Sequence, residues 1–201
     1  MKIVIIKYNA GNIRSVDFAL QRLGVSAFIT DDHDEIRNAD RVIFPGVGEA
    51  STTMDYLKNH HLDQLICDLK QPVLGVCLGL QLMCTHSEEG DTSCLGIFPE
   101  KVKKFVLSER DSSSFKIPHM GWNSVSGIKT ALFNQIGNED YFYFVHSYYA
   151  TIGADTAATC DYLVPFSAAL QRDNFYATQF HPEKSGKTGA KILENFINLK
   201  V

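Results

Sequence analysis

Short apolar runs alternate with amphipathic stretches through the first half of the chain. Ile3–Ile6 is a run of four β-branched residues, which predicts a strand buried on both faces. Val16, Leu20 and Leu23 then recur on one helical face, and Gly24 is placed to end that helix. Further strands are expected at residues 27–30, 42–44 and 73–76, short helices across 54–69, and a helix at 78–84. This alternation predicts a parallel sheet covered by helices on both faces.

The second half of the chain contains more expected strands and fewer helices. Strands are expected at residues 101–106, 141–145, 148–152, 157–162, 166–171 and 175–180. Because few helices separate them, a mixed or antiparallel extension of the sheet is predicted there. Apolar residues at core spacing predict a last helix over residues 189–199, and residues 108–114 are polar enough for an exposed loop. No repeat or linker divides the sequence, so residues 1–201 are expected to form one domain.

Composition narrows the class of protein. The 201 residues are 45% hydrophobic, which suits one soluble globular domain with a sizeable core. A net charge of −4 gives no basic excess, so a large nucleic-acid footprint is not expected. The apolar run near the N-terminus is too short for a signal-peptide core or a membrane span, so we expect a cytoplasmic protein that does not contact a membrane.

The chain has an odd number of cysteines and no Cys-x-x-Cys pair, which fits neither a disulfide framework nor a zinc ribbon. They are Cys67, Cys77, Cys84, Cys94 and Cys160. In the cytoplasm all should be free thiols, so one thiol in a special setting is a candidate nucleophile. The others are interpreted as ordinary buried or solvated thiols.

That special setting is the sequence Gly75-Val76-Cys77-Leu78-Gly79, which lies between an expected strand and an expected helix. It has the nucleophile-elbow pattern with Cys in place of Ser. Gly75 and Gly79 lack Cβ atoms, so strand and helix can approach closely. The helix N-terminus favours a thiolate at Cys77, and the N–H of Leu78 can face a developing oxyanion. The alternative is an inert, buried Cys at a strand–helix junction.

A base and its orienting partner follow another expected strand. The segment after residue 180 reads His181-Pro182-Glu183, so His181 should lie at the same edge of the sheet as Cys77. Glu183 can accept the Nδ1–H of His181 and stabilise the imidazolium. Pro182 stiffens the connection. His60 and His61 could bind a metal, but no third ligand is near in sequence, so no metal site is expected.

A Gly-rich turn, Pro45-Gly46-Val47-Gly48, follows the expected strand at 42–44 and could supply a second oxyanion donor. A dinucleotide loop is excluded because Ser51 stands where the third Gly is required. A Walker loop ending at Thr188 is excluded because His181 occupies the position of its first Gly. No cofactor is implied, since a thiol, an imidazole and backbone N–H groups suffice for the chemistry.

With these motifs the chain resembles the class I (triad) glutamine amidotransferases, and within them the glutaminase subunits of imidazole glycerol phosphate synthase. The resemblance covers essentially the whole chain. Its motifs are Tyr8-Asn9-Ala10-Gly11-Asn12, Pro45-Gly46-Val47-Gly48, Gly75-Val76-Cys77-Leu78-Gly79-Leu80-Gln81, Pro118-His119-Met120-Gly121-Trp122-Asn123, Tyr143-Phe144-Val145-His146-Ser147-Tyr148 and His181-Pro182-Glu183-Lys184-Ser185-Gly186. It implies an α/β, flavodoxin-like three-layer sandwich whose central sheet is mostly parallel, with an antiparallel extension in the C-terminal half.

The resemblance also implies a reaction. Cys77 would attack the carboxamide of glutamine, His181 would move the proton to the departing ammonia, and water would hydrolyse the thioester. Gln81, Ser147 and Tyr148 would hold the amino-acid end of the substrate. The peptide between Gly46 and Val47 would turn an N–H toward the oxyanion only when a partner binds its own ligand.

The implied partner is a (β/α)8-barrel cyclase of the HisF type, which receives the ammonia and makes imidazole glycerol phosphate and an aminoimidazole carboxamide ribotide in histidine biosynthesis. The residues implied at the interface or channel mouth are Asn12, Pro118, Met120, Trp122, Tyr143 and Lys184. Ordinary packing is the alternative for each. Lys7 departs from the Asp that many members carry before the first Tyr.

Three other interpretations remain open from the sequence. The chain could be the glutaminase of another pathway, such as pyridoxal phosphate synthesis, with the same triad and a different barrel partner. It could be a cysteine hydrolase that acts alone on peptides or esters. It could also be a non-catalytic interaction subunit, in which Cys77 would be dispensable.

Overall fold

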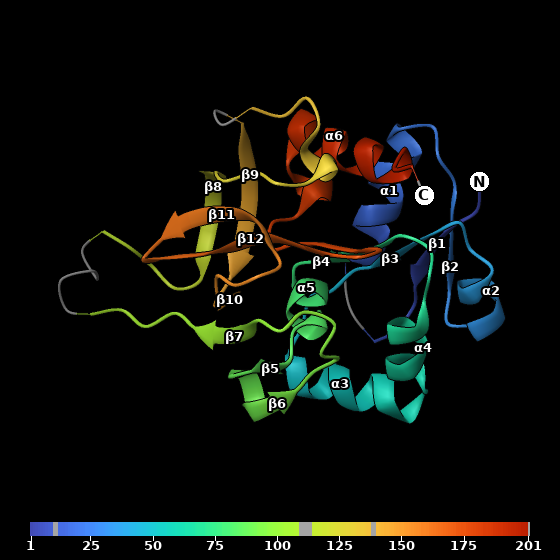
Figure 1. Cartoon of the computed structure of the whole chain (residues 1–201), viewed down its shortest axis with the longest axis horizontal. Coiled ribbons are helices and arrows are strands. Elements are labelled where there is room, and N and C mark those ends of the chain that lie inside the picture. Colours follow the sequence, from blue (N-terminus) through green and yellow to red (C-terminus); the bar gives the residue numbers. More distant parts are fainter. Residues whose placement is uncertain (10–11, 109–113, 138–139, 201) are drawn as a thin grey trace.

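A seven-stranded sheet forms the centre of the computed structural model, which describes residues 1–9, 12–108, 114–137 and 140–200 (Figure 1). Its strand order is β11-β12-β13-β4-β3-β1-β2. The parallel strands are β1 (Ile3–Ile6), β2 (Ala27–Thr30), β3 (Arg41–Phe44), β4 (Val73–Val76) and β13 (Phe175–Thr178), and β12 (Val164–Arg172) and β11 (Thr156–Tyr162) follow antiparallel. The sequence-based prediction of a mostly parallel sheet with an antiparallel extension is therefore confirmed.

Helices cover both faces of this sheet, as the alternating pattern predicts. Figure 1 shows α1 (Ile13–Arg22) and α6 (Gly186–Ile197) on one face. The other face carries α3 (Ala50–Asn59), α4 (Leu62–Asp68) and α5 (Leu78–Met83). Successive side chains of β1 enter two different hydrophobic clusters, Ile3 and Ile5 toward α1 and α6, Val4 and Ile6 toward α3 and α4. A strand buried on both sides must be apolar throughout, which explains the unbroken run.

Two smaller sheets lie beside the central one. An antiparallel pair is formed by β8 (His119–Ser124) and β9 (Tyr141–His146), and a four-stranded sheet has the order β10-β7-β5-β6. Its strands are β10 (Tyr148–Ala150), β7 (Lys101–Lys104), β5 (His86–Ser87) and β6 (Thr92–Ser93). The strands expected in the second half of the chain are thus divided among three sheets. Only β11 and β12 extend the central sheet antiparallel, and β13 joins it parallel to β4.

Several predicted boundaries need correction. The strand expected to 106 ends at Lys104, because Phe105 turns into the core and donates its N–H to the carbonyl of Ser147 at 3.0 Å. The other shortened elements are β10, which ends at 150 rather than 152, β13, which ends at 178 rather than 180, and α5, which ends at 83. The last helix begins at Gly186 and ends at Ile197 rather than spanning 189–199. The loop expected at 108–114 lies largely outside the described residues.

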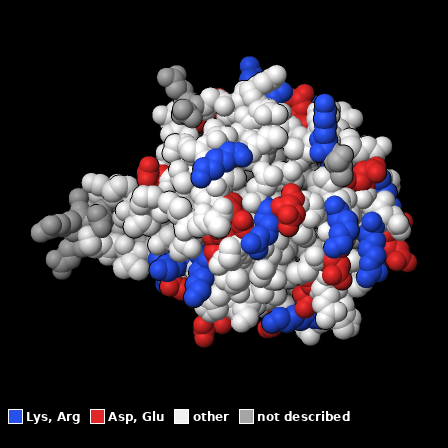
Figure 2. All heavy atoms as spheres, in the orientation of Figure 1, with Lys and Arg blue, Asp and Glu red and all other residues white. Residues whose placement is uncertain are grey.

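One α-helix and three β-strands were not predicted, among them the two-residue strands β5 and β6. Helix α2 (His33–Arg37) is only five residues long, and its identifiable signal is the side chain of Asp32, which accepts the N–H of Glu35 at 2.9 Å. Strand β8 exposes its apolar residues Met120 and Trp122 and buries His119, so it lacks the usual pattern of apolar residues inside and polar residues outside. No helix within the described ranges is long and apolar enough to cross a membrane. On the face shown in Figure 2, acidic and basic side chains are interspersed.

Candidate active site

Cys77 occupies the sharp turn between β4 and α5, with the backbone angle φ at +54°. Few residues other than Gly adopt this region, so surrounding contacts must hold it. One such contact is the N–H of Cys77, which donates to the carbonyl of Thr178 at 2.7 Å. A Cβ on Gly79 would lie 2.2 Å from the carbonyl oxygen of Phe44, so only Gly permits this approach. The predicted elbow geometry is therefore present.

His181 and Glu183 lie beside the elbow because β13 pairs with β4. Nδ1 of His181 is 2.7 Å from Oε1 of Glu183, and both side chains are fully buried. The backbone N–H of His181 donates to the carbonyl of Tyr143 at 2.9 Å, which fixes the residue after its strand has ended. Nε2 of His181 is buried and has no hydrogen-bond partner among the described residues. That leaves this nitrogen available to exchange a proton with the neighbouring sulfur of Cys77.

The electrostatics of the pair favour the imidazolium. Burial lowers the pKa of His181, but the neighbouring Cys77 sulfur and the Glu183 carboxylate outweigh burial and raise that pKa to about 10. Asn12 adds a donor, since its Nδ2 donates to Oε1 of Glu183 and lies 3.5 Å from Nδ1 of His181. Asn12, predicted at a partner interface, therefore directly supports the carboxylate. Thiol, imidazole and carboxylate together can perform general-base-assisted nucleophilic attack.

The predicted oxyanion loop lies against the elbow with a carbonyl pointing inward. The N–H of Leu78 donates to the carbonyl of Gly46 at 3.3 Å. A Cβ on Gly46 would lie 2.8 Å from the N of Gly79, so the loop and the helix N-terminus are in close contact. The hydroxyl of Tyr8 donates to the carbonyl of Pro45 and anchors the loop from behind. The Leu78 donor that an oxyanion would need is thus occupied by a carbonyl in this conformation.

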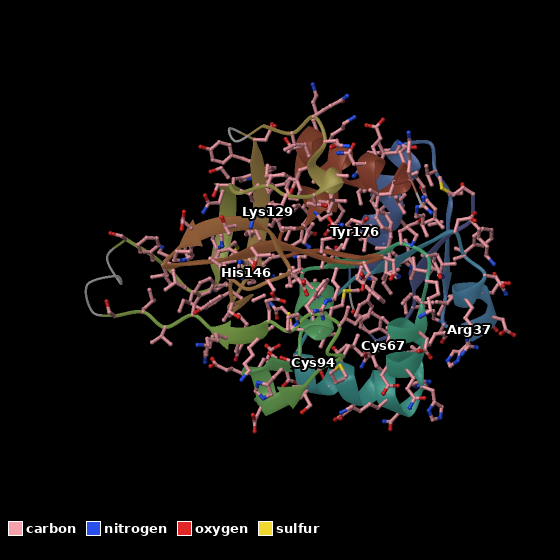
Figure 3. All side chains as sticks on the ribbon, in the orientation of Figure 1. Arg37, Cys67, Cys94, Lys129, His146 and Tyr176 are labelled. Carbon is pink, nitrogen blue, oxygen red and sulfur yellow. The ribbon has the colours of Figure 1, made fainter. Side chains whose placement is uncertain are left out.

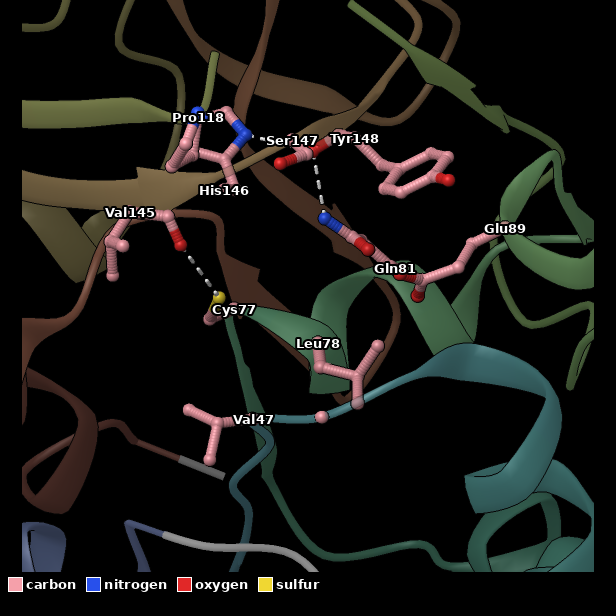
Figure 4. A pocket seen from close by; sticks show the side chains of 11 residues that line it. Val47, Cys77, Leu78, Gln81, Glu89, Pro118, Val145, His146, Ser147 and Tyr148 are labelled. Atoms are coloured by element: carbon pink, nitrogen blue, oxygen red, sulfur yellow. Dashed lines mark hydrogen bonds between the residues drawn. The ribbon is translucent and has the colours of Figure 1, made fainter.

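A cavity of about 320 Å³ opens in front of the sulfur (Figure 4). Its lining includes the predicted substrate residues Gln81, Ser147 and Tyr148, together with Val47, Gly48 and Leu78 of the predicted oxyanion set. Gly46 and Gly79, which were predicted with them, do not line it. Nε2 of Gln81 donates to the carbonyl of Tyr148 at 2.8 Å, which ties the two walls together (Figure 4). The volume is at the low end of the range for small-ligand sites.

Three residues near the site carried no predicted role. Glu89 lines the cavity opposite Cys77, and burial raises its pKa while a hydrogen bond from the N–H of Ala50 opposes that rise. His146 also lines the cavity. Gln179 lies beneath the sulfur with its Nε2 3.7 Å from Sγ. Glu89 gave no sequence signal, because it lies in an ordinary polar stretch, whereas Gln179 is two residues before His181.

The residues predicted at an interface divide into two groups. Met120 and Trp122 are 62% and 54% exposed on β8, and the ring of Trp122 contacts Tyr143 of β9 edge-to-face. Nζ of Lys184 lies 6.0 Å from the centre of the Tyr143 ring, so these four side chains form one face beside the triad. The second group consists of Pro118, which lines the cavity, and Asn12.

The other cysteines lack a comparable setting. Burial raises the pKa of Cys94 to about 11 and of Cys160 to about 12, and it raises the pKa of Cys67 and Cys84 as well. Cys67 and Cys94, both labelled in Figure 3, line a second cavity whose lining does not include Cys77. Within the described part of the chain, no group of three His, Cys, Asp or Glu side chains could hold a metal ion.

The fold and the site define a class of protein. A family model for glutamine amidotransferase class-I matches residues 5–199, and the chain belongs to this family. Two relatives carry the name imidazole glycerol phosphate synthase subunit HisH. The one from Bacteroides thetaiotaomicron is 58% identical, with 99% of this chain and all of the relative covered. The one from Pasteurella multocida is 47% identical, with 98% of each covered.

Solved structures support the fold independently. A structure described as a glutamine amidotransferase has a TM-score of 0.72 at 15% identity and covers 96% of each chain. The structure of PurLQS from Thermotoga maritima has a TM-score of 0.70 at 14% identity, covering 98% of this chain and 97% of the other. At such low identity the likeness concerns the fold alone.

Proposed function

We propose that this chain is the glutaminase subunit of an imidazole glycerol phosphate synthase and releases ammonia from glutamine through Cys77, His181 and Glu183. One observation carries the proposal: an elbow cysteine and a buried His–Glu pair lie together just beyond the ends of the neighbouring parallel strands β4 and β13. Within the pair, Nδ1 of His181 is 2.7 Å from Oε1 of Glu183. The full-length identity to relatives named subunit HisH supports the particular pathway.

The chemistry follows from the positions of these groups. The sulfur attacks the side-chain carbonyl carbon of glutamine, and His181, having taken the thiol proton, gives it to the leaving nitrogen. The C–N bond breaks, ammonia departs, and a γ-glutamyl thioester remains on Cys77. Water, deprotonated at the same imidazole, then hydrolyses the thioester to glutamate. Glu183 keeps Nδ1–H in place and stabilises the imidazolium in both half-reactions.

The cavity walls fit the amino-acid end of glutamine. The carboxylate of Glu89 lies across the cavity and can accept from the substrate ammonium (Figure 4). Both hydrogens of the Gln81 amide are used within the protein, on the Tyr148 carbonyl and on Gln179, so its oxygen is the group left for the ammonium. The hydroxyl of Ser147 can donate to the substrate carboxylate.

Activity should be low in the free chain because the oxyanion hole is closed. The Leu78 N–H donates to the carbonyl oxygen of Gly46 and is therefore not free for an oxyanion. The same carbonyl oxygen would repel the negative charge that develops on the substrate. Rotation of the peptide between Gly46 and Val47 would remove that carbonyl and supply a second N–H. We infer that binding of a ligand-loaded cyclase favours the rotated peptide.

The partner is proposed to be a HisF-type (β/α)8-barrel cyclase bound over the face formed by Met120, Trp122, Tyr143 and Lys184. Exposed aromatic and Met side chains are typical of a protein interface, and this face adjoins the triad. Ammonia could then pass to the cyclase without entering water. A single domain across residues 1–201 is part of the proposal, and the cytoplasmic location remains a prediction from the sequence.

The deciding experiment measures glutamate release by the pure chain with and without a HisF-type cyclase and its nucleotide ligand. We expect strong stimulation by the loaded cyclase, and Cys77→Ser should abolish glutamine-dependent synthesis while sparing synthesis fed with ammonium salts. Full activity without the cyclase would favour a hydrolase that acts alone. Stimulation by a pyridoxal phosphate synthase barrel instead would assign another pathway, and normal glutamine-dependent synthesis by Cys77→Ser would indicate a non-catalytic subunit.

A further inference from the structure

Two hydrogen-bonded side-chain amides connect the nucleophile to the cavity wall: Gln179, which is buried and outside the cavity lining, and Gln81, which belongs to that lining. Gln179 is fully buried, directly after β13, and its backbone N–H donates to the carbonyl of Ala168 at 2.8 Å. Its Nε2 lies 3.7 Å from Sγ of Cys77. Its Oε1 lies 3.0 Å from Nε2 of Gln81, which lies 2.8 Å from the carbonyl oxygen of Tyr148.

The carbonyl of Tyr148 fixes which group donates in each of these side-chain hydrogen bonds. The carbonyl of Tyr148 can only accept, so Gln81 must present its NH₂ group there. The same NH₂ faces Gln179, whose nearer atom must therefore be the oxygen. The far end of that amide, facing the sulfur, is then the NH₂ group. Nδ1 of His146, 2.7 Å from the Tyr148 carbonyl, is a second donor that uses its other lone pair.

The sulfur consequently accepts from Gln179, while as a thiol it can donate to the carbonyl of Val145 at 4.0 Å (Figure 4). A buried N–H that meets sulfur gains most when the sulfur is charged, because hydrogen bonds to ions are roughly twice as strong as neutral ones. In the reaction the sulfur is negative twice, before it attacks glutamine and when it leaves the thioester. A donor at this position would lower the energy of both states and would not alter the thioester between them.

We propose that Gln179 is a further catalytic residue, whose buried side-chain N–H stabilises the Cys77 thiolate from outside the cavity lining. Gln81 acts through Gln179 as a positioning residue, because its amide fixes which end of Gln179 meets the sulfur. The inference rests on the proposed role of Cys77 as the nucleophile. The segment that follows β13 would then supply two catalytic groups. Gln179 donates a hydrogen bond to the thiolate, and His181, two residues later, is the base.

The test replaces Gln179 with Met, which has similar length and no N–H, in the full chain. Alkylation of Cys77 by iodoacetamide is followed against pH by peptide mass spectrometry, with the exposed Cys67 as an internal reference. We expect the midpoint of Cys77 alkylation to move upward by about one pH unit and the rate at neutral pH to fall about 10-fold, as loss of a hydrogen bond to a charged group predicts. Cys67 should react unchanged.

Two further variants complete the experiment. Gln171→Met on β12 is the matched control, since Gln171 belongs to the same sheet and is not one of the two hydrogen-bonded amides, and it should leave the alkylation profile unchanged. If Gln179→Met does not fold, Gln179→Asn keeps the amide but withdraws it by one methylene, and the same upward movement is expected. A folded variant at Gln179 with the parental profile would overturn the inference.

Kinetics separate this inference from the proposed function. With the ligand-loaded cyclase, Gln179→Met should lower kcat for glutamine about 10-fold with little change in KM, because the amide touches sulfur and not substrate. If the parent shows Cys77-dependent hydrolysis and Gln179→Met has the parental kcat, the role of Gln179 is overturned and the proposed function stands. Absence of Cys77-dependent hydrolysis in the parent would overturn the proposed function instead.

Discussion

Replacing Glu183 with Gln isolates the contribution of one negative charge to the triad. The side chain is fully buried and makes two contacts through Oε1, with Nδ1 of His181 at 2.7 Å and with Nδ2 of Asn12. A Gln at this position can present its amide oxygen to both donors. The shape and both hydrogen bonds are therefore retained, the charge is lost, and an NH₂ group replaces Oε2, which is buried without a hydrogen-bond partner among the described residues.

The size of the effect follows from the strength of the remaining bond. A hydrogen bond to a charged group contributes about 1.5–3 kcal/mol, and a neutral one about 0.5–1.5 kcal/mol, so the loss is about 1–2 kcal/mol. Loss of the Glu183 charge disfavours the thiolate–imidazolium pair from which the attack on glutamine occurs, so this loss adds to the barrier. At about 1.4 kcal/mol per factor of ten, kcat should fall about 5- to 30-fold.

The assay is steady-state glutamate release with saturating, ligand-loaded cyclase, comparing kcat and KM. Glu194→Gln is the matched control, because Glu194 forms an exposed pair with Lys191 at 2.9 Å on α6, and such pairs contribute little. We expect parental kinetics for the control. A Glu183→Gln enzyme with kcat within two-fold of the parent, in a preparation where Cys77→Ser is inactive, would refute the reasoning.

The same variant has a defined pH signature in stability. His181 has a pKa raised from 6.5 to about 10, so the stability contributed by its proton is fully present below pH 6.5 and is lost as pH rises toward 10. Glu183→Gln weakens that rise in pKa. The gap in unfolding free energy between parent and variant should be largest below pH 6.5 and should narrow by pH 10, as measured by urea unfolding. A gap that widens with pH would contradict this sign.

Three further outcomes are expected. Gly79→Ala should destabilise the fold by more than about 1 kcal/mol, because the new Cβ would lie 2.2 Å from the Phe44 carbonyl oxygen, whereas Gly137→Ala, with its nearest neighbour at 3.8 Å, should stay within about 0.5 kcal/mol by thermal unfolding. Glu89→Gln should raise KM for glutamine about 10-fold with a smaller change in kcat, and an unchanged KM would exclude Glu89 from substrate binding. Trp122→Ala should weaken cyclase binding by more than about 1 kcal/mol in titration calorimetry and leave thermal unfolding unchanged, since its side chain is 54% exposed.

Much of the architecture was predictable because its causes are local. The apolar run Ile3–Ile6 must be buried on both faces, which requires a covered parallel sheet. The Gly-x-Cys-x-Gly pattern between a strand and a helix likewise predicts the elbow, and Cys77 does adopt the required positive φ. Helix α2 and strand β8 were missed because one is too short and the other too exposed to give a periodic pattern.

The sequence by itself determined which residue types could do the chemistry, since a thiol, an imidazole and a carboxylate in these motifs allow few reactions. Only the tertiary structure decided how they are used. Pairing of β13 with β4 joins segments about a hundred residues apart, and it brings Gln179 beneath the sulfur. Packing alone places Asn12 on Glu183 and the Gly46 carbonyl on the Leu78 N–H. Such contacts depend on the relative positions of distant backbones, to which local periodicity is insensitive.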